Sequence, residues 1–174
     1  KEAEDARRRV DEILEELRKL HDEVRKTDKE LLDDLEREHE RVKREDDKIL
    51  DTLRRQGIPK SLLEEIKRLS EDSKRYLEEN RKESRRLSEE SKRKLDENLE
   101  RSERLAKEIR ERIDSGDDRE KVLEDLERLV ETSRKTVRDI LEESKELVKR
   151  SKENVRRVLE RSKELVKRVS ERAK

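Results

Sequence analysis

Hydrophobic positions recur along the chain with the spacing of an amphipathic helix, and the pattern repeats every 18 residues. Eighteen residues make about five turns at about 3.6 residues per turn, so the apolar stripe returns to the same angle without drift. A heptad repeat would instead impose a left-handed supercoil. The pattern therefore predicts long, nearly straight helices built from similar stacked slices. The clearest repeated sets are Ile13, Leu31 and Ile49; Leu69, Leu87 and Leu105; and Val122, Ile140 and Val158.

The first of two helix-breaking segments lies around residues 56–61. Gly57 suits the left-handed conformation that follows a helix end, and Pro59 suits the first turn of the next helix. Ser61 with Glu64 offers an alternative start, as a capping box. This segment predicts a tight connection between two helices.

The second helix-breaking segment contains Gly116, which again suits the residue after a helix end. Asp117 with Glu120 is typical of an N-cap and its capping partner. Such short loops make consecutive helices antiparallel. We therefore predict an all-α fold, an antiparallel up-down-up three-helix bundle that forms a single domain over residues 1–174. The predicted helices span roughly residues 2–56, 59–115 and 118–173.

The composition changes this picture less than it first suggests. Charged residues make up 59% of the chain and hydrophobic residues 26%, a balance that is typical of disorder. However, the 51 basic and 51 acidic residues are finely interleaved, as in residues 15–19, and interleaved charges support helices. Two Gly and one Pro provide too little turn chemistry for a β-rich fold. The chain is therefore expected to fold as charged helices around a narrow core.

Polar residues occupy many positions inside the apolar stripe. They belong either to a solvated face, with a narrower true stripe, or to buried hydrogen-bond networks repeated in each slice. Asp28 favours burial, because Val24, Leu31 and Leu32 surround it on its own helix face. The predicted network residues are His21, Asp28, His39, Asp46, Ser70, Ser73, Asn80, Ser84, Ser88, Ser91, Asn98, Ser102, Ser133, Ser144, Ser151 and Ser162.

The candidate chemical groups do not assemble into a recognisable reactive site. His21 and His39 share a face but are about 27 Å apart along a helix, so they cannot bind one metal ion. The chain has no Cys, which excludes disulfides and thiolate metal sites. We expect no enzymatic activity, cofactor or metal, although buried histidines could make the networks mildly sensitive to pH.

Partners and location follow from charge and hydropathy. The formal net charge of zero argues against a dedicated nucleic-acid or membrane-surface binder, and no small-molecule substrate is expected. No apolar run is long enough for a transmembrane helix or a signal-peptide core. The sequence therefore predicts a soluble protein without a targeting signal, cytoplasmic if produced recombinantly.

The 18-residue slices, the two glycine loops and the polar stripe positions together resemble computationally designed helical bundles with straight helices and modular buried hydrogen-bond networks. The likeness extends over the whole chain, and it includes the absence of Met, Phe and Trp and the balanced surface charge. Natural spectrin repeats share the topology but normally carry core aromatics and heptad packing. The resemblance implies a scaffold or rigid part with no natural substrate.

Whether the chain acts alone is left open by the sequence. The supply of apolar residues matches one three-helix core, with a surplus at the edges of the stripe. If these edges flank the place of a fourth helix, the chain would accept a partner helix or a second copy. The hypotheses are a self-contained scaffold, a subunit of a homo- or hetero-oligomer, and a natural charged spacer. The candidate partner-facing edge consists of Leu14, Leu32, Leu50, Leu123, Leu141 and Leu159.

Overall fold

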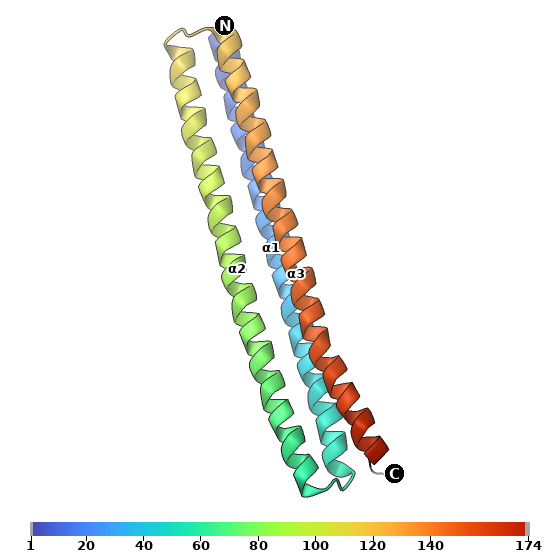
Figure 1. Cartoon of the computed structure of the whole chain (residues 1–174). Coiled ribbons are helices and arrows are strands. Elements are labelled where there is room, and N and C mark those ends of the chain that lie inside the picture. The colour runs from blue at the N-terminus through green and yellow to red at the C-terminus, as the bar shows by residue number, and fades with distance from the viewer. Residues whose placement is uncertain (1, 173–174) are drawn as a thin grey trace. The chain divides into compact units, whose positions relative to one another are not determined.

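The computed structural model describes residues 2–172, and these form three α-helices joined by two short loops (Figure 1). Helix α1 spans Glu2–Arg55, α2 spans Lys60–Asp114 and α3 spans Arg119–Arg172. All three pairs of helices are in contact, and the described residues contain no strand. The prediction of an all-α three-helix bundle is therefore confirmed. The predicted helix limits are accurate to one residue, although residue 173 lies outside the described residues.

The contacts divide the chain into two compact units, each containing a stretch of every helix. Unit 1 combines the chain up to Glu30 with Ser88–Ser144. Unit 2 combines Leu31–Leu87 with the chain from Lys145 onward. The two units are described separately below.

Paired residues within each unit give the directions of the helices. In unit 2 the pairs between α1 and α3 keep a nearly constant sequence separation, 118 for Arg156 and Glu38 and 116 for Ser162 and Asp46, so these helices are parallel. In unit 1 the separation between α1 and α2 partners falls from 85 to 63 along α1, so α2 is antiparallel. The up-down-up order follows from these pairings.

Both loops depend on a glycine with a left-handed backbone. Gly57 has a φ of 68° and Gly116 a φ of 76°. Residues with a Cβ rarely adopt this left-handed backbone conformation. At the second loop, Gly116 N–H donates to the Ile113 carbonyl and Asp117 N–H donates to the Arg112 carbonyl. This pair of bonds is a Schellman motif, which satisfies carbonyls that the helix end leaves free.

The helix starts differ from the predicted capping residues. The side chain of Asp118, not Asp117, caps α3 by accepting a hydrogen bond from Glu120 N–H at 3.2 Å. Asp117 instead accepts a bond from the Arg112 guanidinium at 3.3 Å. Pro59 lies just before the first helical residue, where its carbonyl accepts bonds from Leu62 and Leu63. Both differences are one-residue shifts, because several adjacent polar residues can serve as a cap.

The core of each unit alternates between apolar clusters and polar side chains. In unit 1 one cluster is centred on Val10, Leu17 and Leu126, and another joins Val24, Leu95 and Val137. In unit 2 one cluster joins Val42, Leu77 and Val155, and another joins Leu53, Ile66 and Val169. Between the two clusters of each unit lie polar stripe residues, such as His21 in unit 1 and Asp46 in unit 2.

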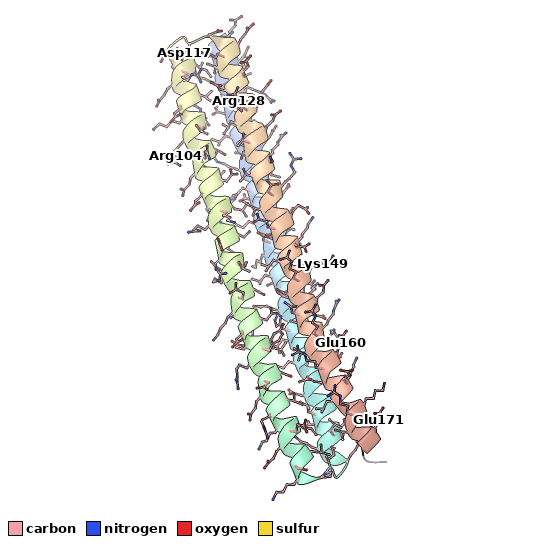
Figure 2. The ribbon with its side chains drawn as sticks, viewed as in Figure 1. Arg104, Asp117, Arg128, Lys149, Glu160 and Glu171 are labelled. Carbon is pink, nitrogen blue, oxygen red and sulfur yellow. The ribbon has the colours of Figure 1, made fainter. Side chains whose placement is uncertain are left out.

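Charged side chains cover the outside of the helices (Figure 2). Arg104, Lys149 and Glu160 are exposed examples that project away from the ribbon. Among the described residues, no helix is long and apolar enough to cross a membrane.

The leucines of the candidate partner-facing edge lie mostly inside the bundle. Leu14, Leu50 and Leu159 are buried, and Leu32 and Leu141 are half-buried. Leu123 alone is exposed, at 38%. These six leucines therefore do not form a continuous exposed apolar line.

Candidate functional site

All sixteen polar stripe residues are at least partly removed from solvent. Ser73, Asn80, Ser88, Ser91, Asn98 and Ser144 are half-buried. The other ten are buried: His21, Asp28, His39, Asp46, Ser70, Ser84, Ser102, Ser133, Ser151 and Ser162. These ten are also the only buried polar or charged side chains in the described part of the chain. The residues of the candidate site therefore lie at the interfaces between helices.

In unit 2, His39 joins a cluster that links all three helices. Its Nδ1–H donates to the Leu35 carbonyl at 2.9 Å, which leaves Nε2 as an acceptor for the Asn80 amide at 3.2 Å. The same amide contacts the Ser151 carbonyl at 3.4 Å. Ser151 Oγ lies 3.1 Å from Ser84 Oγ. Both ring nitrogens of His39 therefore have partners.

In unit 1, His21 occupies the repeat-equivalent position but binds differently. Its Nε2 lies 3.1 Å from Asp96 Oδ1, so the ring N–H donates a hydrogen bond to this carboxylate. Nδ1 is buried without a hydrogen-bond partner, and its nearest carboxylate oxygen, Asp22 Oδ1, is 3.5 Å away. Asn98 does not reach this ring and donates instead to Ser133 Oγ at 3.1 Å. Ser102 also lies 3.1 Å from Ser133.

A buried aspartate forms the second polar level in each unit. In unit 1, Asp28 accepts a hydrogen bond from Ser91 at 2.9 Å, and Ser91 lies 3.2 Å from Ser144. Asp28 Oδ1 is buried without a partner. In unit 2, Asp46 accepts a hydrogen bond from Ser162. Each aspartate thus bonds to serines on neighbouring helices.

Burial dominates the electrostatics of these aspartates. It raises the pKa of Asp28 above its usual range, against the lowering effect of bonds from Ser91 and Ser144. Burial likewise raises the pKa of Asp46, although the bond from Ser162 opposes the shift. A raised carboxyl pKa means that the charged form is disfavoured in the folded protein.

Two polar residues of the site were not named from the sequence. Asp96, the partner of His21, lies directly after the buried Leu95. Because Asp96 is half-exposed at the edge of the stripe, the sequence pattern did not indicate that it binds a buried side chain. Glu38 is only 14% exposed and binds both Arg41 at 2.7 Å and Arg156 at 3.1 Å. The Arg41 hydrogen bond is the main reason that the pKa of Glu38 falls to about 2. Its position, 18 residues after Leu20, is the sequence signal that could have revealed it.

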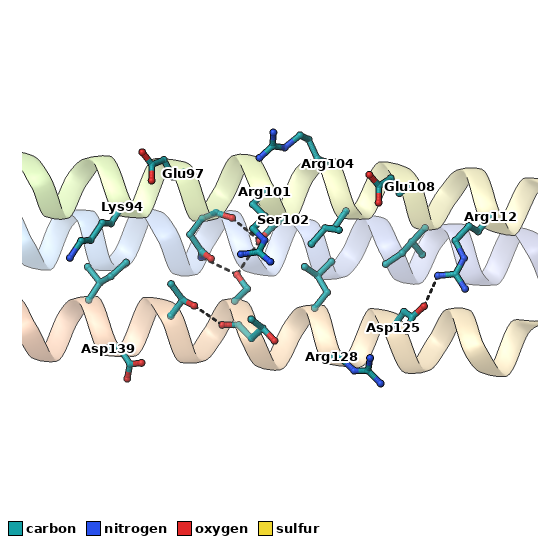
Figure 3. Close-up of a pocket in the computed structure, with 18 of the residues that line it drawn as sticks. Lys94, Glu97, Arg101, Ser102, Arg104, Glu108, Arg112, Asp125, Arg128 and Asp139 are labelled. Carbon is teal, nitrogen blue, oxygen red and sulfur yellow. Dashed lines mark hydrogen bonds and ion pairs between the residues drawn. The ribbon is translucent and has the colours of Figure 1, made fainter.

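Each unit also has a surface groove between α2 and α3. The groove in unit 1 has a volume of about 920 Å³, a polar floor that includes Asn98 and Ser102, and charged walls (Figure 3). Arg112 spans it to Asp125 at 2.5 Å. The groove in unit 2 is about 440 Å³.

Within the described residues, no group of three or more His, Asp or Glu side chains is arranged to hold a metal ion. Comparison with protein-family models, with curated proteins and with solved structures finds no match for this chain.

Proposed function

We propose that this chain is a structural part, a three-helix scaffold without a substrate, in which buried polar networks specify how the helices pair. The observation that carries the proposal is that the buried polar residues bond across helices. In unit 2, Asn80 joins α2 to His39 on α1, and Ser84 joins α2 to Ser151 on α3. Such bonds form only when the helices are in one register, whereas aliphatic contacts tolerate shifts.

Stability alone does not account for these polar side chains. Replacing buried polar groups with well-packed aliphatic residues is often neutral or stabilising. A chain selected only for stability would carry leucine at these levels. The resemblance to designed bundles with modular networks leads to the same function, because there such residues select one pairing.

Distance measurements in unit 1 test this function. Spin labels would replace the exposed residues Lys19 on α1 and Glu100 on α2. We expect one narrow distance distribution for the otherwise unchanged chain. A variant with His21→Leu, Asp28→Leu and Asn98→Leu should keep its helicity and melt at an equal or higher temperature, but with a broader or multiple distance distribution.

The control is the apolar exchange Ile13→Leu, which changes a core residue and leaves every polar bond intact. This control should retain the narrow distribution. An equally narrow distribution in the triple variant would show that apolar packing alone sets the pairing, and the proposed role of the polar residues would be wrong.

A further inference from the structure

The groove of unit 2 carries an unusual concentration of exposed apolar surface. Its floor includes Leu50, Val158 and Leu165. Leu69 and Tyr76, which also line it, are 40% and 37% exposed. Only three large hydrophobic side chains of the described chain are this exposed, and the third, Leu123, lines neither groove. Tyr76 is also the only aromatic residue in the sequence, and aromatic residues are enriched at protein interfaces.

The two walls of this groove carry opposite charges at the same level. Asn80 and Ser84 both contact Ser151, which places residue 82 of α2 level with residue 151 of α3. Because the helices are antiparallel, a shift of ten residues brings Asp72 level with Arg161. Both residues line the groove. At this level an acidic residue of the α2 wall therefore lies opposite a basic residue of the α3 wall.

These two charges do not neutralise each other within the chain. Among residues 2–172, the ion-pair partner of Asp72 is its helical neighbour Arg75, at 3.8 Å. Arg161 has no ion-pair partner among residues 2–172. The groove of unit 1 differs, because ion pairs already span it from Lys94 to Glu143 at 3.6 Å and from Arg112 to Asp125. No ion pair joins the two walls of the unit 2 groove among its described lining residues, so Arg161 remains open to a partner, and the groove also has exposed apolar side chains.

We propose that the unit 2 groove is a self-association surface that binds the same groove of a second copy. A two-fold axis parallel to the helices lays α2 of one copy on α3 of the other. This arrangement brings each Asp72 to the Arg161 of the partner and encloses Leu69 and Tyr76. A two-fold axis across the helices would instead place α2 on α2, without this pairing. The inference goes beyond the proposed scaffold role and does not depend on it.

The dimer is expected to be weak. Standard interfaces bury about 800 Å² per partner, and a single short groove provides less. Sedimentation velocity of the full chain, from about 1 µM to about 1 mM, should show a monomer converting to a dimer with a dissociation constant of tens to hundreds of micromolar. A monomer over the whole range would overturn the proposal.

Exchanging the two charges tests the orientation of the two copies in the dimer. Asp72→Arg and Arg161→Asp each place like charges at both contacts, so each variant alone should dimerise at least about 10-fold more weakly. An equimolar mixture of the two variants restores an opposite pair at both contacts, and it should dimerise as the unchanged chain does. Equal weakening in the mixture and in the separate variants would overturn this geometry, and circular dichroism would verify that both variants remain helical.

Matched substitutions of two exposed leucines test whether the dimer interface lies at the unit 2 groove. Leu69→Glu should weaken dimerisation by about 10-fold or more, because it places a charge in the centre of the interface. Leu123→Glu alters a side chain of nearly equal exposure outside the groove and should change the dissociation constant by less than about 2-fold. A dimer that is insensitive to Leu69→Glu, or equally sensitive to both changes, would place the interface elsewhere.

Discussion

His21 in unit 1 and His39 in unit 2 lie 18 residues apart in the sequence and both are buried, yet the two rings use opposite nitrogens as hydrogen-bond donors. His39 in unit 2 donates through Nδ1 and accepts at Nε2 from Asn80. His21 in unit 1 donates through Nε2 to Asp96 and leaves Nδ1 without a partner. The residue equivalent to Asp96 in unit 2 is Glu78, which is exposed. One carboxylate at the edge of the stripe thus changes the bonding of a buried ring.

A second difference concerns the position of Glu38. In unit 1 the equivalent residue is Leu20, which packs against the cluster of Val24 and Val137. In unit 2, Glu38 takes this place and binds Arg156 from α3. Residues at the edge of the stripe therefore differ between the units, and these differences change how each unit satisfies its polar groups.

The largest expected effects come from equivalent core leucines. Leu95 in unit 1 is fully buried, and Leu77 in unit 2 is 7% exposed. Leu95→Ala should cost about 3–4 kcal/mol of local stability, and Leu77→Ala somewhat less, because a cavity at a more exposed site relaxes more easily. Hydrogen exchange of amides in each unit would measure both. A larger loss for Leu77→Ala would show that the exposure of these two leucines does not set the relative cost of removing them.

Substitution of the equivalent asparagines Asn80 and Asn98 should show how much the bond to the histidine in unit 2 stabilises the protein. Asn80→Leu removes the donor to the buried His39 Nε2, and an unpaired buried acceptor costs about 1–3 kcal/mol. Asn98→Leu removes a donor to Ser133, which retains its contact with Ser102, so the loss should be smaller. Urea denaturation of both variants measures the difference. Equal losses would indicate that the His39 bond contributes nothing beyond the serine contacts.

The sequence was sufficient to predict the helices because few signals compete with them. Two glycines and one proline are the only strong breakers, and both glycines have the left-handed backbone that their positions required. The angle of each residue on the helix was likewise enough to name polar side chains that face inward. The periodicity of the sequence shows which residues share a helix face, and in a helix bundle the face decides which residues are buried.

The hydrogen-bond partners could not be derived in the same way. Asn98 and Asn80 are equivalent in the repeat, but only Asn80 reaches a histidine. The choice depends on side-chain rotamers and on neighbours from other helices, such as Asp96. Hydrogen-bond distances of about 3 Å are set by the packing of neighbouring helices, and a pattern along one helix does not contain this information.

Acid should change the stability of both units through carboxyl groups whose pKa values are shifted. Asp28 and Asp46 have raised pKa values when folded, so the folded state binds protons more readily and stability should rise as the pH falls from 7 toward the usual aspartate pKa of 3.8. In unit 2, Glu38 has the opposite shift, and its contribution is lost as the pH falls from 4.5 to about 2. Unit 2 should therefore gain and then lose stability. In unit 1 the hydrogen bond from Arg112 lowers the pKa of Asp125, so this carboxyl also opposes the rise due to Asp28.

Urea midpoints between pH 7 and pH 2 would measure this dependence. Asp28→Asn should reduce the initial rise, because an amide does not titrate. Glu38→Gln should reduce the loss at low pH while leaving the rise intact. A stability that falls steadily from pH 7 in the unchanged chain would contradict the raised pKa values of both aspartates.

The smallest expected effect concerns a surface pair whose polarity is reversed between the units. Arg18 on α1 faces Glu103 on α2 at 3.3 Å in unit 1, and Glu36 on α1 faces Arg85 on α2 at 3.0 Å in unit 2. Arg18→Glu creates a like-charge contact and should cost about 0.2–1 kcal/mol at low salt. Adding Glu103→Arg gives unit 1 the polarity of unit 2 and should recover the loss.

Thermal melts at low and high salt would measure both steps, and recovery should disappear in high salt because these side chains are exposed. Failure of the double variant to recover at low salt would show that the two positions are not energetically coupled and that the reversed polarity does not help to fix the pairing of α1 with α2.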